Sequence, residues 1–147
     1  MAGVKTTSFK NGENFVLSLE ITNLSDELIL FTSLDTKDFM NVYRLNKLKP
    51  REQELIGKPY RHIFCTLQLG YLIQAKDKLK IQIAWVNREW TIGSPFYSGI
   101  FCSTADNDFL SPGQYVSEFS SGFSFVSGEV DYTTPVKHFE ISFIIED

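Results

Sequence analysis

The sequence is poor in the residues from which catalytic and metal sites are usually built. Its 147 residues include only two cysteines, two histidines and two methionines, and its nine glycines are scattered singly. No glycine-rich phosphate-binding loop is therefore present. Cys65 and Cys102 are too few for a disulfide scaffold and have no partners at metal-ligand spacing. We read them as buried thiols or as one disulfide between strands, and the sequence indicates no enzyme, no cofactor and no bound metal.

Long apolar runs are also missing. No stretch approaches the roughly 18 apolar residues that a membrane-spanning helix needs, and the N-terminal residues lack the apolar core of a secretory signal. We therefore expect a chain without a membrane span, and a cytoplasmic location.

Basic residues are nearly absent from the C-terminal part of the chain. Residues 94–147 contain one basic residue, Lys137, against eight acidic ones, whereas residues 1–93 contain 13 basic and 10 acidic residues. The net charge of −4 argues against a nucleic-acid binder driven by bulk charge. The asymmetry suggests that the two halves could meet between copies of the chain, which would make a homo-oligomer.

Aromatic residues, in contrast, are abundant and favour pleated sheets over helices. The chain contains 13 Phe, 6 Tyr and 2 Trp. Alternation of apolar and polar residues and intervening turn signals predict strands within residues 15–21, 28–33, 60–73, 79–92, 99–103, 114–119, 122–127 and 136–146. The pattern predicts an all-β fold: a single antiparallel two-sheet β-sandwich domain over residues 1–147, jelly-roll or immunoglobulin-like, with about eight or nine strands and at most one short helix.

Two hairpins are expected. Residues 79–93 form the clearer one, in which Trp85 lies opposite Trp90 whether Asn87 and Arg88 make a two-residue turn or residues 86–89 make a four-residue loop. Residues 15–33 form the second candidate, because two apolar strands flank the polar stretch at residues 23–27.

Two long connections interrupt the strands. Residues 35–57 are ambiguous between irregular or short-strand structure and a short helix, and the stretch after Pro50 could hold one or two helical turns before Gly57 and Pro59 end them. Residues 104–114 form the other connection, where Pro112 and Gly113 suit the centre of a type II turn. Binding functions tend to lie on such loops.

Basic side chains with flanking tyrosines give the best positional hint of a binding site. An anionic partner, such as phosphate, an acidic protein surface or single-stranded nucleic acid stacking on the tyrosines, could dock there. A solvated loop that keeps a sheet edge soluble gives the same pattern. The acidic second loop could add oxygen ligands, although solvated carboxylates are the simpler interpretation. The candidate binding residues are Tyr43, Arg44, Lys47, Lys49, Arg51, Lys58, Tyr60, Arg61, Asp106, Asn107, Asp108 and Tyr115.

Carbohydrate binding is the alternative function. Sugars pack against exposed aromatic rings, and Tyr97, Tyr115 and Tyr132 lie in or beside expected loops. Most aromatic residues will instead fill the core. This alternative corresponds to a ligand-binding sandwich of the lectin or toxin-subunit kind.

Catalysis would have to depend on the few candidate acids and bases. His138, Glu140 and Ser142 share a face of one expected strand, but alternate strand residues stand about 7 Å apart, beyond hydrogen-bond reach. His62 and Cys65 point to opposite faces, so they cannot form a pair. The leading hypothesis is therefore a non-catalytic binding or assembly module that recognises a protein partner, or another copy of itself, through its long loops.

Overall fold

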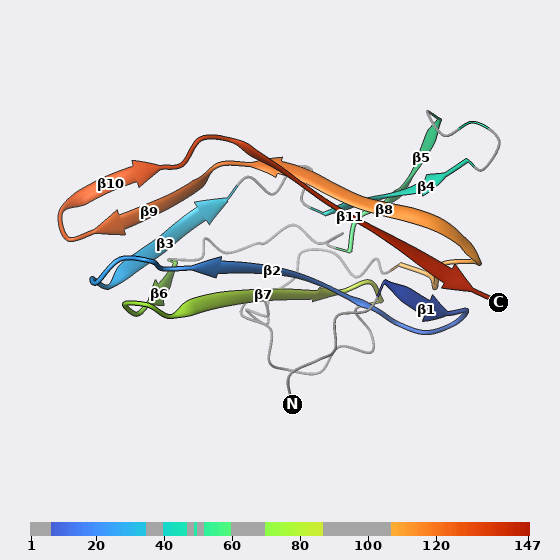
Figure 1. Ribbon diagram of the computed structural model, residues 1–147, viewed down its shortest axis with the longest axis horizontal. Helices are drawn as coiled ribbons and strands as arrows, with labels where there is room; N and C mark the ends of the chain where they lie inside the picture. The colour runs from blue at the N-terminus through green and yellow to red at the C-terminus, as the bar shows by residue number, and fades with distance from the viewer. Residues whose placement is uncertain (1–6, 35–39, 47–48, 50–51, 60–69, 87–106) are drawn as a thin grey trace.

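The computed structural model describes residues 7–34, 40–46, 49, 52–59, 70–86 and 107–147. These residues contain eleven strands and no helix (Figure 1). The strands are β1 (Ser8–Lys10), β2 (Val16–Thr22), β3 (Ile29–Leu34), β4 (Asn41–Leu45), β5 (Gln53–Gly57), β6 (Tyr71–Ile73), β7 (Lys78–Ala84), β8 (Gly113–Ser121), β9 (Phe123–Ser127), β10 (Val130–Thr133) and β11 (Lys137–Glu146).

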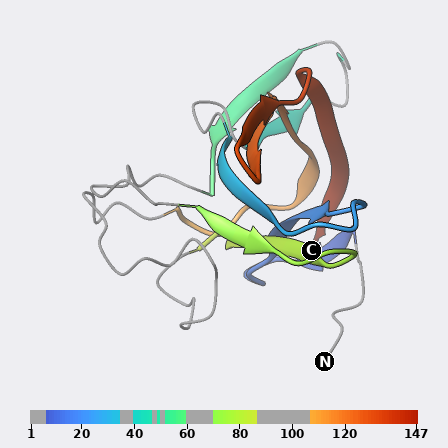
Figure 2. The same cartoon turned by 90° about the vertical axis from the view of Figure 1, so that its left-hand side faces the viewer.

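The strands form three sheets, which confirms the all-β class and is consistent with a β-sandwich. A five-stranded sheet has the order β1-β11-β8-β4-β5, a four-stranded sheet the order β10-β9-β3-β6, and β2 pairs with β7. Seen from one end, the yellow-green segment of β6 and β7 lies low in the view and the red strands β10 and β11 lie above it (Figure 2). One pairing departs from the expected antiparallel pattern, because β1 runs parallel to β11.

A long antiparallel ribbon links the two larger sheets. β8 pairs with β11 over nine residue pairs, and the same two chain segments continue as the β9–β10 hairpin (Figure 1). At the junction, a Cβ on Gly122 would lie 2.8 Å from the carbonyl oxygen of Thr134, so only glycine fits without a shift. The ribbon therefore crosses from one sheet to the other at a point where its two segments lie in close contact.

The interior is largely aromatic, as the composition predicts. The ring of Phe15 stacks on Trp85 with centroids 5.7 Å apart and also lies 4.9 Å from the ring of Phe143. The indole nitrogen of Trp85 donates a hydrogen bond to the carbonyl oxygen of Asp108. The alternation over residues 15–21 predicts that Phe15, Leu17, Leu19 and Ile21 face inward. Phe15, just before β2, is buried, as are Leu17 and Leu19 within it, and Ile21 is partly buried against the same core.

The expected hairpin over residues 15–33 is wrong. β2 and β3 are both strands, but β2 pairs with β7 while β3 pairs with β6 and β9. The connection between them therefore passes from one sheet to another. The polar stretch 23–27 suits either a hairpin turn within one sheet or a connection between two sheets. Its composition alone therefore does not predict which of the two it forms.

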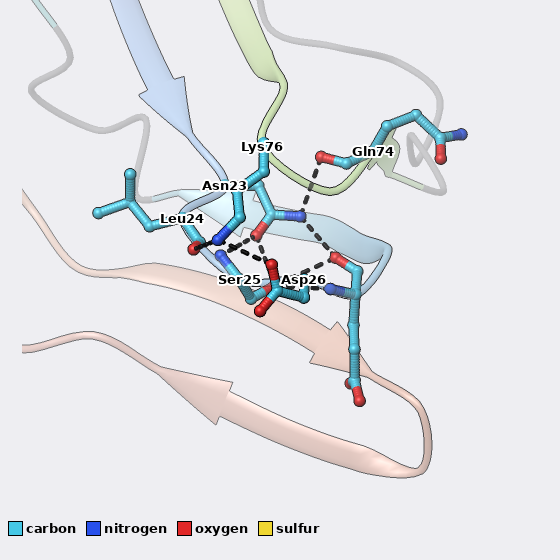
Figure 3. A network of polar contacts seen from close by, with 7 residues as sticks. Asn23, Leu24, Ser25, Asp26, Gln74 and Lys76 are labelled. Carbon is cyan, nitrogen blue, oxygen red and sulfur yellow. Dashed lines mark hydrogen bonds and ion pairs between the residues drawn. The ribbon is translucent and has the colours of Figure 1, made fainter.

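Asn23 holds this connection in place with its buried side chain, which is 2% exposed. Its amide nitrogen donates to the carbonyl oxygens of Glu27, Ile73 and Gln74 at 2.7 to 3.1 Å (Figure 3). Its side-chain oxygen accepts hydrogen bonds from the backbone and hydroxyl of Ser25. One side chain thus ties the β2–β3 connection to the turn between β6 and β7, which explains why the chain can leave the β2–β7 sheet here.

The hairpin expected at residues 79–93 is described only in its first strand. β7 is present, and Asn14 extends its pairing with β2: the amide of Asn14 exchanges two hydrogen bonds with the backbone of Val86 at 2.9 and 3.0 Å. Trp85, expected to face inward, is buried. Its expected partner Trp90 and the turn at Asn87 and Arg88 lie outside the described residues.

The ambiguous region 35–57 contains strands β4 and β5. The helical turn considered after Pro50 is wrong, because Gln53–Gly57 is a strand paired with β4. Pairing within the sheet here overrides the helix start and stop signals. The type II turn at Pro112 and Gly113 is also wrong: Gly113 opens β8 and does not have the positive φ that this turn requires.

Candidate functional site

Two polar features stand on the five-stranded sheet. The first, which we call the histidine cluster, consists of Glu118 and Ser120 on β8 with His138 and Glu140 on β11. In the ladder, Glu140 lies directly opposite Glu118 and His138 directly opposite Ser120. Because directly opposed residues point to the same side of a sheet, all four side chains share the face away from Phe119 and Phe139.

The imidazole of His138 lies at the centre of this cluster. Its Nε2 is 3.7 Å from a carboxylate oxygen of Glu118 and 3.7 Å from one of Glu140. Its Nδ1 is 3.1 Å from the hydroxyl of Ser120. One ring nitrogen therefore faces two carboxylates while the other is hydrogen-bonded to a hydroxyl.

A serine, a histidine and a glutamate in contact raise the question of catalysis. Nucleophilic catalysis also needs donors for an oxyanion and a cavity that holds the substrate. His138 is about half exposed, and none of the four residues lines the groove described next. The histidine cluster is therefore separate from that groove.

The second feature is a groove at the end of the same sheet, where β8 begins and β11 ends. Its volume is about 720 Å³. It is lined by polar and apolar residues from β4, β5, β8 and β11 and the segments next to them, and its charged residues are Arg44, Glu52, Glu54, Glu146 and Asp147. We call it the acidic groove, because four carboxylate residues face a single arginine.

The arginine in the acidic groove is held by its own fold. Arg44 donates a hydrogen bond to the carbonyl oxygen of Pro112 at 2.9 Å, and its guanidinium lies 5.9 Å from the ring centroid of Tyr115. Two of the acids are also engaged, since Glu52 pairs with Lys49 and Glu146 accepts a hydrogen bond from Ser8. The guanidinium of Arg44 is thus held by contacts within the fold. Because acidic residues outnumber this one basic residue in the lining, the groove carries a net negative charge.

The sequence-predicted binding residues that the structure describes do not all lie on one surface. Arg44 lines the acidic groove and Tyr43 lies on the opposite face of β4, where its hydroxyl accepts a hydrogen bond from Asn41. Tyr115 is 1% exposed, and its hydroxyl donates to the carbonyl oxygen of Ser111. Its ring is part of the core and offers no platform for a ligand.

The remaining predicted residues divide between structural and solvent positions. The buried Asn107 donates to the carbonyl oxygens of Lys58 and Trp85, so its amide fastens the segments that follow β5 and β7. Asp108 is exposed, and Lys49 forms an exposed ion pair with Glu52. Lys47, Arg51, Tyr60, Arg61 and Asp106 lie outside the described residues, as do His62, Cys65, Tyr97 and Cys102.

Sequence reasoning missed the residues that complete both features. It placed His138 and Glu140 on one face but not Glu118 and Ser120, which come from a strand about 20 residues earlier and meet them only through the register of β8 with β11. It also placed the binding surface among basic residues, whereas the acidic end of β11 lies beside Arg44. The uneven charge along the chain was the available signal.

Comparisons with protein-family models, curated proteins and solved structures found no match for this chain. Among the described residues, no helix is long and apolar enough to cross a membrane.

Proposed function

We propose that this protein is a non-catalytic binding module that holds an extended, basic segment of a partner protein in the acidic groove. The observation that carries the proposal is the charge of the groove, which is lined by four acidic residues, Glu52, Glu54, Glu146 and Asp147, and by one basic residue, Arg44. Lysine or arginine side chains of a partner would meet a complementary potential there, which favours both encounter and correct orientation.

The shape and the chemistry of the lining favour a peptide over a sugar. A volume of about 720 Å³ falls in the usual range for binding sites. The residues that line the groove include no aromatic side chain, and a pyranose would need one to pack against. The partly exposed Tyr132 stacks on Phe125 in the β9–β10 hairpin, in a different sheet from the acidic groove.

The edge position of β5 supports an extended partner. β5 is the last strand of its sheet, and among the described strands it pairs only with β4. An incoming extended segment could add to such an edge through backbone hydrogen bonds while its side chains reach Glu52 and Glu54, which lie beside and on β5. Backbone pairing would supply affinity and the groove would supply the preference for basic residues.

The test compares two peptides of equal length, one with lysines and one with glutamates on the same glycine and serine spacing. We expect the lysine peptide to shift the amide NMR signals of Gln53, Glu54, Gly113 and Gln114 in the labelled protein, and the glutamate peptide to leave them in place. The affinity should fall as salt is raised, because the attraction is between exposed charges.

Matched variants locate the interaction. Glu54→Gln and Asp147→Asn should each weaken lysine-peptide binding about 1.5- to 5-fold, as is usual for one exposed charge pair. Glu129→Gln, in the turn between β9 and β10, should leave it unchanged. Equal binding of both peptides, or shifts confined to residues outside the groove, would overturn the proposal.

A further inference from the structure

The charges of the histidine cluster are arranged unfavourably for a surface with no ligand. Glu118 and Glu140 are directly opposed in an antiparallel ladder, and like charges in that position destabilise a sheet. Their strands are paired over nine residue pairs, so the backbone keeps the two glutamates adjacent on the same face. A cation between them would remove this cost.

The histidine supplies a second, independent indication. In the tautomer in which Nδ1–H donates to the hydroxyl of Ser120, the lone pair of Nε2 faces the two carboxylates. Metal-binding histidines commonly use one ring nitrogen for the ion and donate a hydrogen bond from the other. The orientation of this ring is therefore the orientation that a metal ligand needs.

The distances suit a single ion. One potential ligand atom from each of Glu118, His138 and Glu140 lies within 4.8 Å of the other two. A tetrahedral Zn²⁺ with bonds of about 2.0 to 2.1 Å separates its ligands by about 3.3 Å. The carboxylates reach that spacing from 3.7 Å of Nε2 by small side-chain rotations, with the backbone ladder unchanged.

We propose that Glu118, His138 and Glu140 form a binding site for a divalent transition-metal ion, with Zn²⁺ as the best-suited ion. One imidazole and two carboxylates suit Zn²⁺ better than Mg²⁺ or Ca²⁺, which prefer ligand sets made of oxygen alone. Three protein ligands leave one position for water or for a group from another molecule. The site stands apart from the acidic groove, so it goes beyond the function proposed above and does not depend on it.

The competing explanation is a histidinium held between two glutamates with no metal. Calorimetric titration of the full chain with ZnCl₂, after treatment with a chelator, separates the two. We expect one ion per chain. His138→Gln, Glu118→Gln and Glu140→Gln should each weaken binding at least about 10-fold, and Ser120→Ala, which removes only the partner of Nδ1, should weaken it about 10-fold.

The controls exclude the other metal-binding side chains of the chain. His62→Gln removes the only other histidine and should leave zinc binding unchanged. Titration with Co²⁺ should give only the weak visible bands of nitrogen and oxygen ligands, without the strong near-ultraviolet absorption of a cysteine thiolate. Circular dichroism should show that each variant keeps its strand content.

Three results would overturn the proposal. The first is the absence of binding in the wild-type chain, which would leave the histidinium explanation. The second is binding that persists in His138→Gln and in Glu118→Gln. The third is binding that is lost in His62→Gln or accompanied by thiolate absorption, which would place the ion elsewhere. None of these results bears on the peptide experiment, so the two proposals can fail separately.

Discussion

The two faces of the β8–β11 ladder share one backbone but differ in how their side chains are matched. On the inner face, Phe119 stacks on Phe139 at 4.9 Å and Tyr115 stacks on Phe143 at 5.5 Å. On the outer face, the position between these two pairs holds two opposed carboxylates. The inner pairs contribute to stability, whereas the outer pair opposes it until something positive lies between its members.

The inner aromatic pairs therefore stabilise the sheet, whereas the outer carboxylates do not and are candidates for binding a ligand. Any polar side chains keep an exposed strand soluble. Neutral side chains, or side chains of opposite charge, would do so without electrostatic repulsion between neighbouring strands. The histidine cluster and the acidic groove both depart from that arrangement, and both lie on the ladder that the inner aromatic pairs stabilise. The comparison can be tested by removing one side chain from each face.

Phe143→Ala should produce the largest loss. The ring of Phe143 is 4% exposed and contacts the rings of Phe9, Phe15 and Tyr115. Its truncation removes apolar burial and leaves a cavity, so the free energy of unfolding should fall by about 3 to 5 kcal/mol in denaturant titrations. Ser142→Ala, one residue away on the outer face, should change it by less than about 0.5 kcal/mol. Similar losses from the two variants would contradict the assignment of the faces.

Asn23→Ala should have the next largest effect. It tests whether the hydrogen bonds of a buried polar side chain stabilise the fold, as the packed aromatic rings do. The substitution leaves the carbonyl oxygens of Glu27, Ile73 and Gln74 without their shared donor. Leaving buried polar groups unsatisfied costs about 1 to 3 kcal/mol each, partly recovered where water enters, so we expect a net loss of about 2 to 3 kcal/mol.

The control for Asn23 is Gln114→Ala, at an exposed amide side chain on β8 that lines the acidic groove. It should change the free energy of unfolding by less than about 0.5 kcal/mol. Hydrogen exchange should also show faster opening of β6 in Asn23→Ala, since the connection that fastens β6 is lost. An unfolding curve identical to that of the wild type would mean that the Asn23 contacts add nothing to stability.

The sequence was sufficient for the class of fold because alternation is a local property. Over residues 15–21, the two-residue period predicts four inward residues, of which Phe15, Leu17 and Leu19 are buried and Ile21 is partly buried. The same period placed Phe143 and Ile145 inside, although Ile141 on the same predicted face is 46% exposed. A period identifies the face of a strand but not how far the opposite layer covers it.

Pairing between distant strands could not be read in the same way. Several strands of similar length and composition compete as neighbours, and their registers decide which polar residues meet. Glu118 is separated from Glu140 by the whole β9–β10 hairpin, so nothing in the spacing brings them together. The acidic groove was missed for the same reason, since it needs β4, β8 and β11 side by side.

Glu118→Gln should have the smallest effect and the opposite sign. At pH 8 and in the presence of a chelator, removing one of two opposed charges should raise the free energy of unfolding by about 0.2 to 1 kcal/mol. Glu140→Gln should do the same, and the double variant should gain less than the sum of the two, because either substitution alone ends the repulsion. Addition of ZnCl₂ should reverse the order, so that the wild type becomes the more stable protein. If Glu118→Gln instead destabilises the chelated protein, the two carboxylates already have a favourable partner in His138, and the outer face is as well matched as the inner one.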